Sequence, residues 1–275
     1  MKRSVGDLAR AIQETSLYAL CFLLPFSKAA VEIAFGGLLV GWVLERLDPR
    51  TRAESLWGSK RLRPLLLSLV AYLGICALSV LVSRYPSLSL RAFFSKWLEY
   101  ALLMVITADV CRRPRVVRQG LTILACSALF VLIEGFTQER FGSGLFRGYR
   151  LDFFDRMTGP YENPIDLATY LMVMIPILLA HAVRHRNPLP RAALFALTGL
   201  LLLSLGRTMA LGAWVGLAAG LLGIILVGDA VFRRCGLVLL VAAAVGGGWF
   251  VQRAGVLSGT LPLFSGVIRR AGPLH

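Results

Sequence analysis

The chain has 275 residues, of which 57% are hydrophobic and only 16% are charged, and its mean hydropathy is +0.70. A soluble domain carries roughly a quarter charged residues, so this composition excludes an ordinary soluble protein and predicts an integral membrane protein. The net charge of +15 lies in short clusters between apolar segments, a pattern typical of a multi-pass topology, and we expect no nucleic acid partner.

A helix of about 20 apolar residues crosses the hydrocarbon core of a bilayer. On this basis we predict an all-α, polytopic membrane helix bundle of about nine spans. The expected spans are 11–27, 29–46, 64–83, 89–109, 119–136, 163–181, 192–205, 208–227 and 236–252. No small-residue cleavage site follows the first apolar run, so we expect that run to remain as an anchor.

The basic clusters between these spans predict the orientation, because cytoplasmic loops of membrane proteins are enriched in Lys and Arg. With the N-terminus in the cytoplasm, the inner cations are Lys2, Arg3, Arg10, Arg46, Arg50, Arg52, Lys60, Arg61, Arg63, Arg112, Arg113, Arg115, Arg118, Arg184, Arg186, Arg191, Arg233 and Arg234. Four consecutive inner loops follow the rule, so we predict a cytoplasmic N-terminus.

The connection 137–162 departs from this pattern, because its arginines fall on the predicted outer face. Arg147, Arg150 and Arg156 are interleaved with aromatic residues, and guanidinium groups bind phosphate oxygens in a bidentate geometry. We therefore expect this loop to bind a lipid phosphate or pyrophosphate. The alternative is that Asp152 and Asp155 neutralise two of the arginines and leave a solvated loop.

The segment 157–171 has the features of a helix start at the same face. Asn163 is placed to act as the N-cap, with Pro164 in the first helical position. The N–H groups and partial positive charge of a helix N-terminus favour an anion, so Asn163 is a candidate for substrate binding. Simple capping without a ligand is the alternative.

Arg207 lies in a very short connection, 205–208, between two apolar segments. Such an arginine either extends to the outer headgroups or faces a polar cavity in the bundle, and we favour the cavity. For Glu134, one turn before the loop, we expect a hydrogen-bonding role. The GxxxGxxxG run of the next span predicts close helix packing through Gly212, Gly216 and Gly220.

Other chemistry-bearing residues give little signal. The five cysteines show no paired spacing, so we expect neither a disulfide framework nor a metal site. The histidines fall on an inner loop or at the last residue, so none is placed to act as a base at the outer face.

Three stretches together resemble the O-antigen ligase family, which includes the related O-antigen and exopolysaccharide polymerases. They are LYALCFLLPFSKAAVEIAFGGLLVGWVL, RMTGPYENPIDLATYLMVMIPILLA and LLLSLGRTMALGAWVGLAAGLL. The resemblance covers the chain to about residue 255 and implies a fold similar to the C-type glycosyltransferases.

The resemblance implies an activity and a location. Glycan is transferred from undecaprenyl pyrophosphate to a sugar hydroxyl of the lipid A core, or of a growing polysaccharide in a polymerase, at the periplasmic face of the bacterial inner membrane. No metal or other cofactor is implied. Arg156 and Arg207 match the family's catalytic arginines, and Arg147 and Arg150 are additional candidates for pyrophosphate binding.

The resemblance also predicts a departure from the family. Residues 1–255 correspond to a multispan domain, and 256–275 are expected to begin an outer segment that is truncated before the family's large periplasmic loop. The family's acceptor-activating histidine belongs to that loop, so we expect little catalysis by this chain alone. A transporter or flippase of an anionic lipid is the alternative from another class, although no internal repeat favours it.

Overall fold

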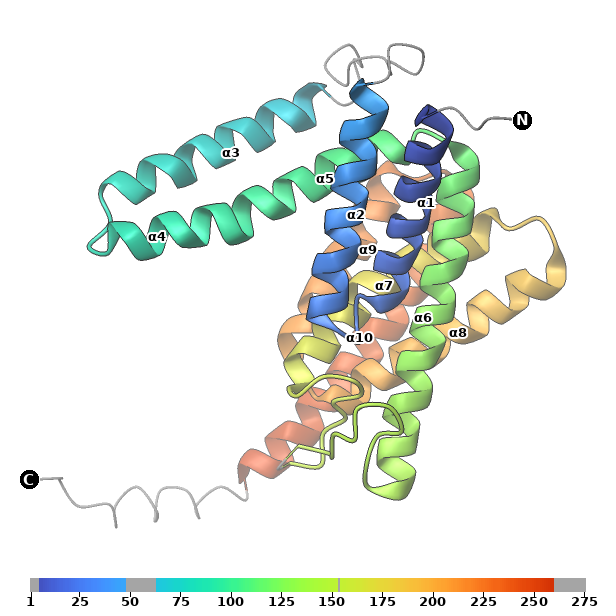
Figure 1. The fold of residues 1–275 in the computed structure, drawn as a ribbon. Helices are drawn as coiled ribbons and strands as arrows, with labels where there is room; N and C mark the ends of the chain where they lie inside the picture. Colours follow the sequence, from blue (N-terminus) through green and yellow to red (C-terminus); the bar gives the residue numbers. More distant parts are fainter. Residues whose placement is uncertain (1–4, 48–62, 153, 260–275) are drawn as a thin grey trace, which may run out of the picture. The chain divides into compact units, whose positions relative to one another are not determined.

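The computed structural model describes residues 5–47, 63–152 and 154–259, and these parts contain helices and no β-strand (Figure 1). The helices are α1 (Val5–Leu23), α2 (Lys28–Leu47), α3 (Arg63–Leu81), α4 (Pro86–Ala92), the π-helix η2 (Phe93–Leu98), α5 (Glu99–Val110), α6 (Pro114–Phe141), α7 (Pro164–Arg184), α8 (Pro188–Thr208), α9 (Leu211–Val227) and α10 (Ala230–Gly259). The all-α prediction is confirmed for these residues. The chain divides into two compact units, Met1–Leu124 and Ala125–His275.

In the first unit, α1 and α2 form a hairpin that is interrupted where the sequence contains Pro25 (Figure 1). Proline lacks the N–H group that a helix interior needs, so α1 ends before it. The apolar core of this unit joins α1, α2 and α5 through the fully buried Leu38 and Ile106 and the nearly buried Leu17. This packing fixes the hairpin against α5.

At one end of this unit, a buried carboxylate organises several cations. Glu45 on α2 accepts hydrogen bonds from Arg10 at 2.8 Å, from Gln13 at 2.7 Å and from Arg113 at 2.9 Å. A buried charge is tolerated when it is paired in this way. Arg10 and Arg113, which the sequence predicted only as cytoplasmic cations, therefore also connect α1, α2 and the start of α6.

The expected span 89–109 forms one helical segment with a local irregularity. The chain stays helical from α4 through η2 to α5, with π-helical turns at Phe93–Leu98. This segment packs beside α3 in a hairpin (Figure 1). The rings of Tyr72 and Trp97 meet edge to face at 5.6 Å between the two. The large apolar side chains on α3 remain largely exposed, as expected for a helix that faces lipid.

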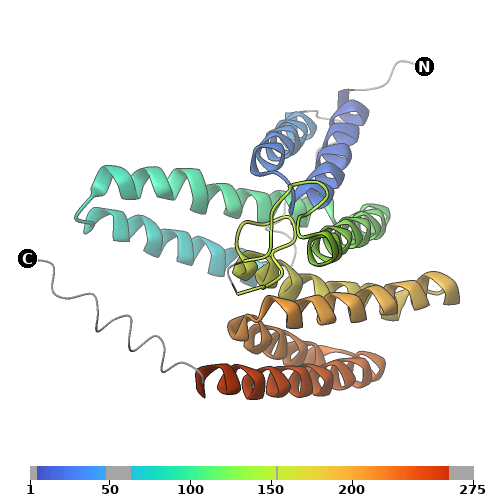
Figure 2. The same ribbon diagram turned by 90° about the horizontal axis from the view of Figure 1, so that it is seen from below.

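The second unit contains α7 to α10, and Figure 2 shows α8, α9 and α10 as neighbouring rows of helices. Helix α7 packs against both α8 and α9 through a buried face that includes Leu171, Ile175 and Leu178. Gly216 on α9 lies so close to α7 that an added Cβ would meet the Met172 sulfur, whereas Gly212 and Gly220 have open space. The small-residue packing prediction is thus confirmed for Gly216 only.

The connection between α8 and α9 is as tight as the sequence indicates, but it lies slightly later than 205–208. Helix α8 continues to Thr208, and Met209 reverses the chain with a left-handed φ of 52° and ψ of 32° before α9 begins at Leu211. A left-handed conformation is uncommon for a residue with a side chain, so the surrounding packing holds this turn.

Within the described residues, three helices are long and apolar enough to cross a membrane: α6, α7 and α8. Leu66–Leu81 and Leu211–Leu226 are shorter apolar helices. These helices support a membrane protein, and they coincide with the expected spans 64–83, 119–136, 163–181, 192–205 and 208–227. The full set of nine spans stays a prediction.

Several sequence predictions fall on residues outside the described parts. These are the basic residues Lys2, Arg3, Arg50, Arg52, Lys60 and Arg61, His275, and residues 260–275 of the expected outer segment. The described part of that segment, 256–259, is helical because α10 continues past residue 252 to Gly259. The expected domain boundary at 255 stays a prediction.

Candidate functional site

The loop that follows α6 is held in place by one buried amide, Gln138. Its Nε2 donates to the carbonyl oxygen of Tyr149 at 3.1 Å and to the Thr158 hydroxyl at 2.8 Å. Its Oε1 accepts the backbone N–H groups of Thr158 at 3.0 Å and Gly159 at 3.1 Å. One side chain thus ties both ends of the segment 149–159 to the helix.

Glu134, one turn earlier and fully buried, holds the first part of the loop. Its two carboxylate oxygens accept the backbone N–H groups of Phe146 at 2.8 Å and Arg147 at 2.9 Å. Gly144 passes so close that an added Cβ would lie 2.3 Å from Oε1, so only glycine fits there. The hydrogen-bonding role predicted for Glu134 is confirmed.

The loop is also joined to the α8–α9 turn by the backbone. The N–H group of Met157 donates to the carbonyl oxygen of Arg207 at 3.1 Å. This bond places Arg156 and Arg207, which lie far apart in the sequence, on adjoining backbone segments. The two guanidinium groups are paired with different carboxylates, Asp152 and Glu139.

Arg156 binds Asp152 through two donors, Nε at 2.9 Å and Nη2 at 2.5 Å, and its guanidinium lies over the Phe154 ring. The turn that makes this possible has Asp155 at a left-handed φ of 55°. Asp155 itself forms no ion pair among the described residues, so of the two carboxylates that could neutralise arginines, Asp152 does so.

Arg207 donates from Nε to Glu139 Oε1 at 2.5 Å, and its side chain is 51% exposed. An exposed, paired arginine differs from the expected one inside a polar cavity. Glu139, on α6, was not singled out by the sequence analysis, because nothing in the local sequence connects positions 68 residues apart.

The other two loop arginines lie at the surface. Arg147 donates to the Tyr149 hydroxyl at 2.8 Å, and that hydroxyl donates to Glu162 at 3.0 Å. Arg150 is exposed, and its guanidinium has no hydrogen bond or ion pair within the described residues. Arg150 is therefore the candidate whose charge is most available to an anion.

A cavity of about 410 Å³ lies beside Arg156, between α7 and the start of α9. Its lining residues are Arg156, Ile165, Ala168, Thr169, Met172, Met209, Ala210, Leu211, Gly212 and Ala213. Arg156 is the one charged residue among them, so the cavity combines apolar walls with a single guanidinium, which is paired with Asp152.

Two helices begin around this cavity. Asn163 caps α7, with its Oδ1 accepting the N–H group of Ile165 at 2.9 Å and Pro164 in the first position, as predicted. Helix α9 begins at Leu211 without a side-chain cap. Helix N-termini favour anions, and because α7 carries the Asp166 carboxylate in its first turn, the start of α9 is the stronger source of positive potential near Arg156.

Tyr161 closes the loop against α7, where its ring lies 6.2 Å from that of Tyr170. Burial, and then the neighbouring Tyr170 and Asp166, raise the pKa of the Tyr161 phenol far above its usual range. Tyr161 therefore stays neutral and can donate a hydrogen bond but cannot serve as a base near neutral pH.

No group of His, Cys, Asp or Glu in the part of the chain that the structure describes is arranged to hold a metal ion. Gln138, Glu139 and Thr158 shape the loop and were missed by the sequence analysis. A buried glutamine is not distinguished in a sequence from an exposed one, so its four hydrogen bonds appear only in the fold.

Comparisons with known protein families, with curated proteins and with solved structures give no match for this chain.

Proposed function

We propose that this chain binds a glycan carried on undecaprenyl pyrophosphate and serves its transfer to a sugar hydroxyl of the lipid A core, in the manner of an O-antigen ligase. The observation that carries the proposal is the single cation, Arg156, in an otherwise uncharged cavity between two helix N-termini. The resemblance of three sequence stretches to that family supports it.

In this proposal the apolar walls of the cavity receive isoprenoid units, and Arg156 binds the adjacent phosphate. Arg207 and Arg150 bind the second phosphate, Arg147 supports them from the loop surface, and the Asn163-capped start of α7 adds positive potential. Fixed guanidinium groups in a site of low dielectric stabilise the charge that develops as the pyrophosphate leaves, a contribution of several kcal/mol.

The proposed setting is the periplasmic face of the bacterial inner membrane, reached through about nine spans with a cytoplasmic N-terminus. The distribution of cations along the sequence supports this orientation. A tag at residue 156 that is labelled from the periplasm by a membrane-impermeant reagent fits the proposal, and labelling only after the cytosol is opened contradicts it.

Equilibrium binding tests the donor site directly. The purified chain in lipid nanodiscs is titrated with undecaprenyl pyrophosphate, undecaprenyl monophosphate and undecaprenol. We expect the pyrophosphate to bind most tightly, and Arg156→Ala to weaken it by about tenfold or more, as for loss of a charge-assisted hydrogen bond. Arg140→Ala, at an exposed arginine without a partner among the described residues, is the matched control.

Equal binding of undecaprenol contradicts the proposal, because it removes the role of phosphate. The transfer step is tested in cells that lack their own ligase, by measuring glycan attached to the lipid A core. Where the unaltered chain restores glycan attachment, these assignments are wrong if Arg156→Ala and Arg207→Ala both retain that activity. If the chain extends a polysaccharide instead, it is a polymerase.

A further inference from the structure

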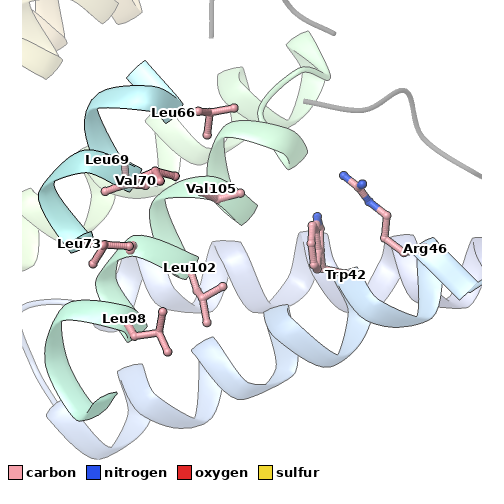
Figure 3. A pocket seen from close by; sticks show the side chains of 10 residues that line it. Trp42, Arg46, Leu66, Leu69, Val70, Leu73, Leu98, Leu102 and Val105 are labelled. Atoms are coloured by element: carbon pink, nitrogen blue, oxygen red, sulfur yellow. The ribbon is translucent and has the colours of Figure 1, made fainter. Parts of the chain in front are cut away.

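The first unit contains a second apolar cavity, unrelated to the loop after α6. It is a groove of about 280 Å³ between α2, α3 and α5 (Figure 3). Leucine and valine side chains of α3 and α5 form its walls, and Trp42 and Arg46 of α2 close one end. Because its walls are hydrocarbon and it opens onto exposed apolar faces, the groove fits an aliphatic chain.

The groove has a polar end and an apolar end. Arg46 lies in the last turn of α2, Leu66 in the first turn of α3 and Val105 near the end of α5, whereas Leu73 and Leu98 lie deeper. From Leu66 to Leu73 a helix rises about 10 Å, or roughly two-thirds of the hydrocarbon depth of one leaflet. An acyl chain that enters beside Arg46 can therefore follow the groove over this length.

The charge at the rim identifies the kind of headgroup. Asp109 is the carboxylate that Arg46 binds at 2.6 Å and Arg112 approaches at 3.6 Å. The Arg46 guanidinium also lies over the Trp42 ring, 4.6 Å from its centre. With one N–H used for Asp109, its remaining donors can bind phosphate oxygens.

We propose that this groove is a binding site for an anionic phospholipid, with an acyl chain between α3 and α5 and its phosphate on Arg46. Tryptophan is enriched at the headgroup level of membrane proteins, so Trp42 beside Arg46 suits a headgroup at this end of the groove. The site is separate from the donor cavity, and the inference does not depend on the proposed function.

The test measures binding of phosphatidylglycerol and of phosphatidylcholine with the same acyl chains to the purified chain in detergent, by native mass spectrometry. Leu73→Trp fills the groove, and Leu78→Trp places the same side chain on an exposed position of the same helix. We expect phosphatidylglycerol to bind more tightly, Leu73→Trp to weaken it about tenfold, and Leu78→Trp to have no effect.

A second pair of variants tests the headgroup contact. Arg46→Gln should weaken the binding of phosphatidylglycerol about fivefold, which is the effect expected from losing one cation beside an anionic headgroup. It should also remove the preference for phosphatidylglycerol over phosphatidylcholine. Asp109 keeps its bond from Trp42 Nε1 at 2.9 Å in this variant, so the unit should remain folded. Arg91→Gln, an equal loss of charge on α4, should leave the preference unchanged.

Three results would overturn the proposal. Unchanged lipid binding by Leu73→Trp places the lipid elsewhere. If Leu73→Trp changes the oligomeric state but leaves the affinity for lipid unchanged, the groove is assigned to a second copy of the chain. Displacement of phosphatidylglycerol by an equal concentration of undecaprenyl pyrophosphate, with loss of both in Leu73→Trp, assigns the groove to the glycan carrier.

Discussion

Glu139 holds Arg207 by a single hydrogen bond of 2.5 Å between Oε1 and Nε, across 68 residues of sequence. Because the Arg207 side chain is half exposed, the pair adds at most about 1 kcal/mol to the free energy of unfolding. Its larger effect is on charge, since the carboxylate competes with any anion for the guanidinium.

The first prediction separates these two effects. Glu139→Gln should raise the affinity for undecaprenyl pyrophosphate severalfold, and Arg207→Ala should lower it about tenfold, because the first removes a competing negative charge and the second a binding cation. Isothermal titration in nanodiscs measures both, with Arg140→Gln as the control. Weaker binding by Glu139→Gln indicates that the carboxylate orients Arg207 more than it neutralises it.

The second prediction concerns the loop anchor Glu134. Glu134→Ala should lower the free energy of unfolding by about 2–3 kcal/mol, because two backbone N–H groups lose a charged acceptor. The released loop should be cut by trypsin after Arg147 or Arg150 much faster than in the unaltered chain.

Glu162→Ala is the comparison for Glu134→Ala, since Glu162 is an exposed carboxylate of the same loop that accepts from the Tyr149 hydroxyl. Its trypsin cleavage should change little. Equal cleavage of Glu134→Ala and the unaltered chain would show that the loop holds its conformation without this carboxylate.

The third prediction concerns Gln138. Gln138→Leu keeps the size of the side chain but removes four hydrogen bonds, and should cost about 2–4 kcal/mol in the free energy of unfolding. Thermal unfolding in detergent measures the loss. Thr137→Ala, where the hydroxyl only bonds the Glu134 carbonyl of its own helix, should shift the melting temperature much less.

The fourth prediction tests the contact of α9 with α7. Gly216→Ala places a Cβ 2.1 Å from the Met172 sulfur and should destabilise the protein by about 1–3 kcal/mol. Gly212→Ala, with open space, should be neutral or stabilising. Truncating the opposing side chain as well, in Gly216→Ala with Met172→Ala, should recover part of the loss; no recovery would locate the strain elsewhere.

Local signals predicted some of the fold well. The start of α7 follows from Asn163 and Pro164, because capping depends on residues next to each other in the chain. The helix ends were less predictable. Helix α8 begins at Pro188, before the apolar run that predicted the span 192–205. Proline fits the first position of a helix, so the helix can start in polar sequence ahead of the apolar run.

The candidate site was predictable in its arginines and not in their partners. The sequence analysis named Arg156 and Arg207, but the carboxylate that each one binds depends on how distant segments meet. Asp152 was expected, together with Asp155, as a carboxylate that could neutralise an arginine of the loop. Glu139 was not, since only the folded loop and the α8–α9 turn bring it to Arg207.

The left-handed turn at Met209 has a mechanical consequence. With two residues between the last turn of α8 and the first of α9, the chain has no slack with which either helix could slide independently. On the α9 side, widening of the cavity beside Arg156 therefore requires α8 and α9 to tilt as a pair, or the loop to lift off them by releasing the Met157 to Arg207 bond.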